Sequence, residues 1–214
     1  MPARPILYNY WRSTTTYRVR VALNLKGVGY DVAPIDLLAG AQRADTYARL
    51  NPGKGVPTFV LEDGTVLTQS LAILDYIDRQ WPEPPLLPSD PCDRAQALAA
   101  AYTLAVDVHP VNNLRVVQHL HDELGVQPDQ AVSWMQHWTV QGLTAFEALV
   151  RSDTVFAFGD APGLADICLI AQLYNAHRWN VDIAAFPIVQ RIEAACANIP
   201  AFVAAHPDQQ PDAA

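Results

Sequence analysis

The hydrophobic and polar positions of residues 1–81 predict short strands that alternate with two helices. A short apolar run leads into hydroxyl-rich residues, after which apolar positions recur at helical spacing as far as Gly27, a good helix terminator. Asp63 and Gly64 form a hairpin turn signal between two short runs of β-forming residues. The predicted order is β-α-β, a connecting segment, and then β-β-α. The strands are expected at Ile6–Tyr8, Tyr30–Ile35, Thr58–Glu62 and Val66–Leu67, with the second helix at Ser70–Gln80.

The pattern changes after residue 81. Residues 82–91 are rich in proline, which cannot continue a helix, so we expect a stiff linker here. Residues 92–206 are almost entirely helical in pattern, and the polar, proline-containing residues 207–214 are expected to form a flexible tail. The fold class is therefore α/β followed by all-α. The helices of the second part are expected from Arg94 to Leu124, Gln130 to Val150, Ala165 to Trp179 and Ile188 to Ala197.

Composition restricts the class of protein further. Half of the 214 residues are hydrophobic and 17% are charged, which is ordinary for a soluble globular protein. The net charge of −8 argues against non-specific binding to nucleic acid. No apolar run is long enough to cross a bilayer and no signal peptide pattern is present, so we expect a cytoplasmic protein with no membrane partner.

The spacing of cysteine and histidine indicates neither a disulfide framework nor a metal. Cys92, Cys168 and Cys196 are few and scattered, so we expect reduced and mostly buried thiols. The histidines show no H-E-x-x-H or comparable ligand spacing. We therefore predict no metal site.

A cluster of hydroxyl side chains marks the start of the first helix. Residues 13–16 read Ser-Thr-Thr-Thr and lie between Arg12 and Arg18. A helix N-terminus offers backbone N–H groups and a partial positive charge, and it stabilises an anion such as a thiolate. The alternative is simple N-capping, since serine and threonine are the usual caps. Four hydroxyls between two arginines favour an anion site.

Three segments together resemble the zeta class of cytosolic glutathione transferases, over nearly the whole chain. They are RSTTTYRVRVALNLKG, NPGKGVPTF and TQSLAILDYI. The resemblance implies a thioredoxin-like N-terminal domain, a helical C-terminal domain, glutathione as cofactor and a homodimer. The class contains maleylacetoacetate isomerases and related maleylpyruvate isomerases.

The resemblance also implies which residues hold glutathione. Pro57 would follow a cis peptide bond and turn the backbone of Val56 toward the cysteinyl part, although a proline can also simply begin a strand. Gln69 and Ser70 would hold the γ-glutamyl end, where Ser70 is also a helix cap. Lys54 would lie near the glycyl carboxylate. Gly55 stands where the class often has glutamine, so one side-chain contact is expected to be missing.

Ser13 matches the sulfur-contacting serine of the class, with Thr14 and Thr15 as further donors. A free thiol has a pKa of about 8.5, which a helix N-terminus or a nearby cation lowers. Thr15 stands where many members of the class have cysteine, so no protein thiol is available at this position. Glutathione itself is therefore the expected nucleophile, as in the maleylpyruvate isomerase branch.

Arginine suits the carboxylates of a dianionic substrate, because its guanidinium can form two parallel hydrogen bonds. Arg12 borders the hydroxyl cluster. His109 and Arg115 lie in a segment that resembles the central block of the helical domain in maleylpyruvate isomerases. Arg178 matches an arginine in the corresponding helix of the family. These are the expected substrate-binding residues. Surface ion pairs for Arg115 and Arg178, and a core position for His109, are the alternatives.

The predicted function is a glutathione-dependent cis–trans isomerisation of maleylpyruvate or maleylacetoacetate in aromatic catabolism. The thiolate would add to the conjugated alkene, the new single bond would rotate, and the thiolate would leave. A glutathione transferase or dehalogenase of small electrophilic acids, and a non-catalytic glutathione-binding protein, are the alternatives. Asp166 is expected to be a structural half of a capping box whose other half, usually serine or threonine, is Gly163.

Overall fold

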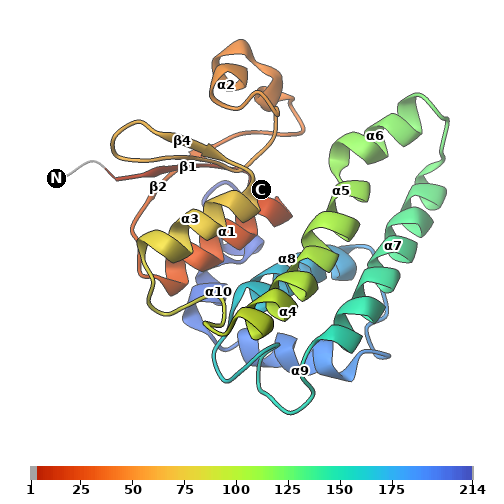
Figure 1. Cartoon of the computed structure of the whole chain (residues 1–214). Helices are drawn as coiled ribbons and strands as arrows, with labels where there is room; N and C mark the ends of the chain where they lie inside the picture. The colour runs from red at the N-terminus through yellow and green to blue at the C-terminus, as the bar shows by residue number, and fades with distance from the viewer. Residues whose placement is uncertain (1–3, 214) are drawn as a thin grey trace. The chain divides into compact units, whose positions relative to one another are not determined.

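The computed structural model describes residues 4–213. The described residues divide into two compact units. The first unit contains the residues up to Pro85 together with those from Asn198 onward, and the second unit is Leu86–Ala197. The helices and strands of the two units are labelled in Figure 1.

The first unit is organised around a mixed four-stranded sheet of order β2-β1-β3-β4. The central strand β1 pairs parallel with β2 and antiparallel with β3, which continues antiparallel into β4. Leu7 on β1 lies opposite Phe59 on β3, and both side chains are fully buried. The predicted strands are confirmed as β1 Ile6–Asn9, β2 Asp31–Pro34, β3 Thr58–Val60 and β4 Val66–Thr68.

Two helices of the first unit, α1 Thr14–Leu25 and α3 Ser70–Gln80, pack against each other (Figure 1). The Nζ of Lys26, after the end of α1, lies 2.8 Å from the Asp78 carboxylate on α3. The connecting segment, left without structure in the sequence-based prediction, contains the 3-10 helix Ala41–Arg43 and helix α2 Asp45–Leu50. These are short elements, which a periodicity of apolar residues detects poorly.

The end of the chain corrects two sequence-based boundaries. Helix α10, Pro200–Ala205, belongs to the first unit, although the helical domain was expected to continue to residue 206. Its Phe202 is 2% exposed, and the helix packs on α1. Residues 207–214 were expected to be a flexible tail, of which residue 214 lies outside the described residues. Pro207–Gln209 instead forms the 3-10 helix η3, and Gln210 is buried. Hydrogen bonds from Asn9 and Trp11, near the start of the chain, hold this segment.

The second unit is helical throughout its described elements. The predicted helix from Arg94 to Leu124 is instead broken into several pieces, because Pro110 lacks a backbone N–H and Asn113 caps a new helix through Arg115 N–H. Gly142 lets α7 approach the π-helix η2 closely, since a Cβ there would clash with Val108. The elements are α4 Pro91–Tyr102, η2 Thr103–Val108, α5 His109–Val111, α6 Leu114–Asp122, α7 Pro128–Leu149, α8 Leu164–Arg178 and α9 Pro187–Cys196.

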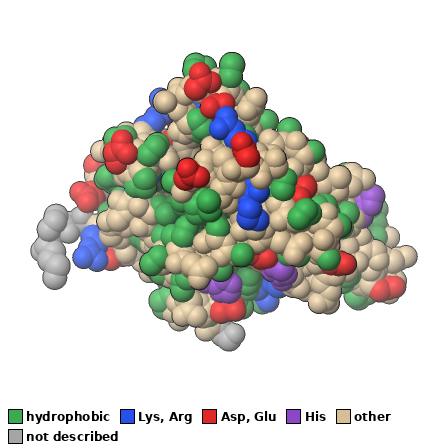
Figure 2. Space-filling view, turned by 90° about the horizontal axis from the view of Figure 1, so that it is seen from below, with side chains coloured by type: hydrophobic (Ala, Val, Ile, Leu, Met, Phe, Trp, Pro, Cys, Tyr) green, Lys and Arg blue, Asp and Glu red, His purple; other side chains and the backbone are tan. Residues whose placement is uncertain are grey.

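The surface carries the acidic excess of the sequence. Figure 2 shows acidic side chains, in red, distributed over the visible face, with basic side chains, in blue, in small separate groups. Among the residues that the structure describes, no helix combines the length and the apolar character needed to span a membrane. The same residues contain no group of three or more metal-ligating side chains.

Candidate functional site

The hydroxyl cluster lies at the N-terminus of α1, as predicted. Ser13 is the N-cap residue, and its Oγ accepts a hydrogen bond from Thr16 N–H at 3.3 Å. The Oγ of Ser13 also lies 2.9 Å from the Oγ1 of Thr15, and the Thr15 hydroxyl donates to the carbonyl oxygen of Val56 at 2.8 Å. N-capping and anion binding are therefore compatible at this position, because the cap uses the Ser13 oxygen only as an acceptor and does not use its hydroxyl hydrogen.

The orientation of these hydroxyls follows from counting hydrogens. A hydroxyl has one hydrogen to donate. Because Thr15 donates its hydrogen to Val56, the Ser13–Thr15 contact requires Ser13 to donate and Thr15 to accept. The Ser13 hydroxyl is half-buried and can turn its hydrogen toward an incoming anion without leaving its cap position. The Thr14 side chain is 3% exposed, so its expected contribution reduces to its backbone N–H.

The peptide bond between Val56 and Pro57 is cis, as the resemblance to the zeta class implies. The loop that leads to it is fixed by two side chains that sequence reasoning missed. Tyr47 donates from its hydroxyl to Gly55 O at 2.6 Å, and Asn51 donates from Nδ2 to the same oxygen at 2.8 Å. Burial raises the pKa of Tyr47, so its hydroxyl keeps this proton over a wide pH range. The sequence signal for this hydrogen bonding was Asn51 alone, because Asn-Pro-Gly is typical of a turn.

The start of α3 forms a second polar site. Ser70 is 5% exposed, and the buried guanidinium of Arg18 lies 3.4 Å from its Oγ through Nη1. The N-cap residue of α3 is Gln69, not Ser70 as the sequence predicted, because Ser70 is already the first residue of the helix. Gln69 is exposed and has a φ of 69°, a left-handed conformation that is costly for residues other than glycine. Lys54 also has a positive φ, of 50°, and its side chain is exposed. A helix N-terminus with a cation behind it suits a carboxylate.

These groups fit glutathione by the chemistry of their donors. The N-terminus of α1 offers hydroxyl and N–H donors for a thiolate. The backbone of Val56 offers a carbonyl for strand-like pairing with a peptide. The start of α3, beside Arg18, and the ammonium group of Lys54 supply positive charge for two carboxylates. The assignment of these contacts to Lys54, Val56, Pro57, Gln69 and Ser70 remains a prediction.

Relieving the backbone strain at Gln69 separates stability from ligand binding. Glycine adopts a positive φ at little cost, so Gln69→Gly is expected to raise the free energy of unfolding by about 0.5–1 kcal/mol. The hydrogen bond predicted between the Gln69 side chain and the γ-glutamyl end would be lost as well, so the Kd for glutathione should rise about fivefold. Gln69→Ala is the matched control, because it loses the same side chain and keeps the strain. Equal stability of the two variants, in urea unfolding, would contradict this explanation.

Arg12 lies in the turn between β1 and α1, where aromatic rings hold its guanidinium. Its Cζ lies 5.3 Å from the ring centroid of Trp11 and 6.0 Å from that of Tyr10. Its Nη2 lies 3.5 Å from the Tyr10 hydroxyl. Stacking of this kind orients a guanidinium and leaves hydrogen-bond donors at its edge for an anion.

The other expected substrate residues lie in the second unit. Arg178, in the last turn of α8, is exposed, stacks 5.1 Å from the Trp179 ring and donates to Asn175 Oδ1 at 3.1 Å. His109 is half-buried, with Nε2 3.4 Å from Asn113 Nδ2. Arg115 is exposed, and its side chain makes no ion pair with another residue of the part that the structure describes. These bonds of His109 and Arg178 run to neighbours in the sequence, so a common function of the three side chains remains a prediction.

Asp166 has the structural position expected for it. One carboxylate oxygen accepts from Ala157 N–H and the other from Gly163 N–H, both at 2.8 Å. Burial raises the pKa of this carboxyl to about 6. The structure also explains Gly163: a Cβ at this position would lie 2.7 Å from Leu86 O, which accepts from Leu164 N–H. A serine or threonine here would require the Leu86 backbone to move.

Comparisons with known proteins identify the family of the chain. Residues 4–79 match the family model of the glutathione S-transferase N-terminal domain. The chain is 45% identical to the maleylacetoacetate isomerase of Rhizobium meliloti, over 98% of this chain and 99% of that protein. It is 39% identical to the maleylpyruvate isomerase of a Ralstonia species, over 97% and 99% of the two chains.

Solved structures give the same result. A maleylpyruvate isomerase in its holo form, described as a bacterial zeta-class glutathione S-transferase, superposes with a TM-score of 0.94 at 38% identity, covering 98% of this chain and 100% of that one. A maleylacetoacetate isomerase from Methylobacterium extorquens AM1, solved with malonate and glutathione, gives a TM-score of 0.94 at 37% identity over 98% and 99%. On its sequence, its fold and its donor groups, the chain belongs to the zeta class of the glutathione transferase family.

Proposed function

We propose that this protein is a glutathione-dependent isomerase that converts maleylpyruvate or maleylacetoacetate to the corresponding fumaryl acid. The observation that carries the proposal is the Ser13–Thr15–Val56 hydrogen-bonded chain at the N-terminus of α1, with no cysteine in the cluster. It offers donors to a bound thiolate and no nucleophile of its own. The names of the relatives supply the class of substrate.

The protein's own contribution is to hold charge and geometry. When bound, glutathione would supply the thiolate for reversible addition to the cis double bond, which is the chemistry that permits cis–trans isomerisation. Ser13 donates its hydroxyl hydrogen to that sulfur and keeps the thiol ionised near neutral pH. The Thr15 hydroxyl fixes the Val56 carbonyl, and Ser70 with the first turn of α3 binds the γ-glutamyl carboxylate.

The substrate is a dianion, whereas the protein has a net charge of −8. Local cations must therefore bind the carboxylates. We assign this function to Arg12, Arg115 and Arg178, with His109 as a further hydrogen-bonding group. The stacking of Arg12 and Arg178 on tryptophan rings supports the assignment, because it orients each planar guanidinium before the substrate arrives.

Arg178→Lys tests whether the planar guanidinium is needed. Lysine keeps the charge and loses the two-pronged geometry, so kcat/KM for the maleyl acid should fall about tenfold, equivalent to about 1.4 kcal/mol. The Kd for glutathione should hardly change. Steady-state kinetics and calorimetric titration of glutathione measure the two quantities. An equal loss in both would mean that Arg178 supports the fold instead of the substrate.

We also propose a homodimer in the cytoplasm. The cytoplasm is rich in glutathione and keeps thiols reduced, which agrees with the three free cysteines of the chain. The homodimer is an inference from the family, whose members associate through their two domains. Light scattering at micromolar protein concentration tests it, and a monomer mass would contradict it.

The decisive test of the function is the amount of glutathione consumed. An isomerase returns glutathione after each turnover, whereas a transferase incorporates it into the product. Maleylpyruvate and a small amount of glutathione, incubated with the enzyme, should give many equivalents of fumarylpyruvate for each glutathione. A stable conjugate after one equivalent would indicate a transferase or dehalogenase. Conversion that proceeds equally well without glutathione would also overturn the proposal.

A further inference from the structure

Residues 207–213, the C-terminal segment, are bound to the turn between β1 and α1. This turn leads to Ser13, where the sulfur of glutathione is proposed to bind; we call that position the sulfur site. Trp11, in the turn between β1 and α1, donates from its backbone N–H to Asp212 Oδ2 at 2.9 Å. Asn9, the last residue of β1, is fully buried and donates from Nδ2 to both Asp212 oxygens, at 3.0 and 3.1 Å. Residues about 200 positions apart in the sequence thus meet at this turn.

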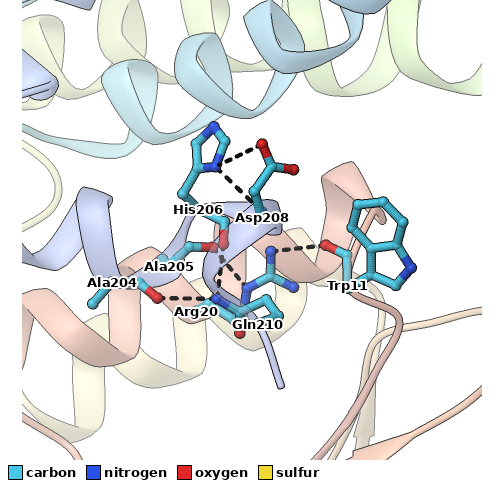
Figure 3. A network of polar contacts seen from close by, with 7 residues as sticks. All are labelled: Trp11, Arg20, Ala204, Ala205, His206, Asp208 and Gln210. Atoms are coloured by element: carbon cyan, nitrogen blue, oxygen red, sulfur yellow. Dashed lines mark hydrogen bonds and ion pairs between the residues drawn. The ribbon is translucent and has the colours of Figure 1, made fainter. Parts of the chain in front are cut away.

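Arg20 holds the same turn from the side of α1. Its side chain is fully buried, and it donates to Trp11 O at 3.1 Å and to Ala205 O at 2.9 Å (Figure 3). It also donates to Asn9 Oδ1 at 2.6 Å. Both hydrogen-bonding groups of the Trp11 backbone are therefore fixed, the N–H by Asp212 and the C=O by Arg20. The Asn9 amide links these two opposite charges.

The C-terminal segment is itself anchored on the first unit. Gln210 is 8% exposed, and its Nε2 donates to Ala204 O at 3.0 Å and to His206 O at 2.9 Å (Figure 3). Asn24 on α1 donates to Ala201 O at 3.1 Å. Asp212 therefore follows residues that Gln210 bonds back to the end of α10, which Asn24 in turn bonds to α1.

The turn held in this way sets the position of Ser13. The Ser13 backbone N–H donates to Tyr10 O at 2.9 Å, so Trp11 is one of the two residues inside that turn. A rotation of the Trp11 peptide would move the Ser13 hydroxyl away from its bond to Thr15. Catalytic hydrogen bonds tolerate displacements of only about 0.5 Å before they weaken.

We propose that Asp212 is a positioning residue for the sulfur site and acts through the Trp11 peptide and Asn9. The proposal deepens the proposed function and rests on it for the identity of the thiol. Residues 207–213 thereby contribute to the activation of the glutathione thiol. Asp212 does not itself contact the sulfur. It fixes the turn before Ser13, and Ser13 donates the hydrogen bond to the sulfur.

The test compares Asp212→Asn with Asp208→Asn. The first change keeps the side-chain volume and puts an amide N–H against the donors of Trp11 or Asn9, whereas Asp208 lies on the same segment, is exposed and pairs with His206. Asp212→Asn should lower the thiolate fraction of bound glutathione at pH 7 about threefold or more, and shift the acid limb of the kcat/KM profile upward. Asp208→Asn should match the wild type, and Asp212→Glu should recover part of the loss.

A second measurement needs no ligand. Amide hydrogen exchange of Trp11 and Ser13 in the ligand-free protein should be faster in Asp212→Asn and unchanged in Asp208→Asn. If the wild type forms no thiolate complex with glutathione, the proposed function fails. The exchange rates then still show whether Asp212 fixes the turn that contains Trp11. A lower midpoint of urea unfolding with unchanged exchange at Trp11, or an unchanged thiolate fraction, would overturn the proposal, because the segment would then only stabilise the fold.

Discussion

Replacing Ser13 by alanine is expected to return the pKa of the bound glutathione thiol toward its free value of about 8.5. The only side-chain hydrogen that can turn toward the sulfur from the N-cap position is lost. Removal of one such donor from an anion site typically lowers kcat by about a hundredfold or more, and we expect a decrease of this size in kcat/KM. Thiolate absorbance as a function of pH, and steady-state kinetics, measure the two effects.

The cluster itself offers a matched control. Thr16 is fully buried, and its Oγ1 has no hydrogen-bond partner in the described part of the chain. Thr16→Val keeps the shape, removes this unsatisfied hydroxyl and leaves the backbone N–H that bonds to Ser13. It should therefore preserve the thiol pKa and the activity, whereas Ser13→Thr should keep most of both. Full activity and an unchanged thiol pKa in Ser13→Ala would transfer the function to the Thr14 backbone N–H or the Thr15 hydroxyl.

The capping function of Ser13 predicts a second, smaller effect of Ser13→Ala. Loss of an N-cap hydroxyl costs about 1 kcal/mol of unfolding free energy. A stability loss of this size is too small to unfold the protein, so a hundredfold loss of activity cannot be explained by unfolding. Measuring the urea midpoint beside the kinetics separates the two contributions of one side chain.

Local features of the site could be predicted from the sequence. The Ser13–Thr16 cluster, the turn before β4 and the start of α3 at Ser70 each depend on a few adjacent residues. Propensity and capping act over that range. The cis bond before Pro57 came from the resemblance to a known class, because a proline alone does not specify it.

Contacts between distant segments could not be predicted. Tyr47 and Asn51 support the Gly55 carbonyl across a loop, and nothing in their periodicity distinguishes them from surface residues. The last residues of the chain were expected to be flexible because they are polar and contain proline. Composition does not reveal that Asn9, at the end of β1, and the backbone N–H of Trp11 provide hydrogen-bond partners for Asp212.

Asp166→Ala is expected to lower the free energy of unfolding by about 3 kcal/mol, because two backbone donors lose their acceptor. Asp166 is 2% exposed, and it holds Ala157 N–H and Gly163 N–H at the start of α8. Asp160→Ala is the control, since this carboxylate lies in the same loop and is exposed. Urea unfolding of both variants measures the difference. A change below about 1 kcal/mol would mean that water reaches both donors.

The pH dependence of this loss identifies its cause. Burial raises the pKa of Asp166 from 3.8 in the unfolded chain to about 6 in the folded protein. The folded state therefore binds the proton more tightly, so this group contributes most to stability below about pH 4, and that contribution is lost as the pH rises through about 6. Asp166→Ala lacks this slope. The difference in unfolding free energy between wild type and variant should thus be larger at about pH 5 than at about pH 7. A difference that grows with pH would instead indicate that the two N–H donors stabilise the charged carboxylate more than burial destabilises it.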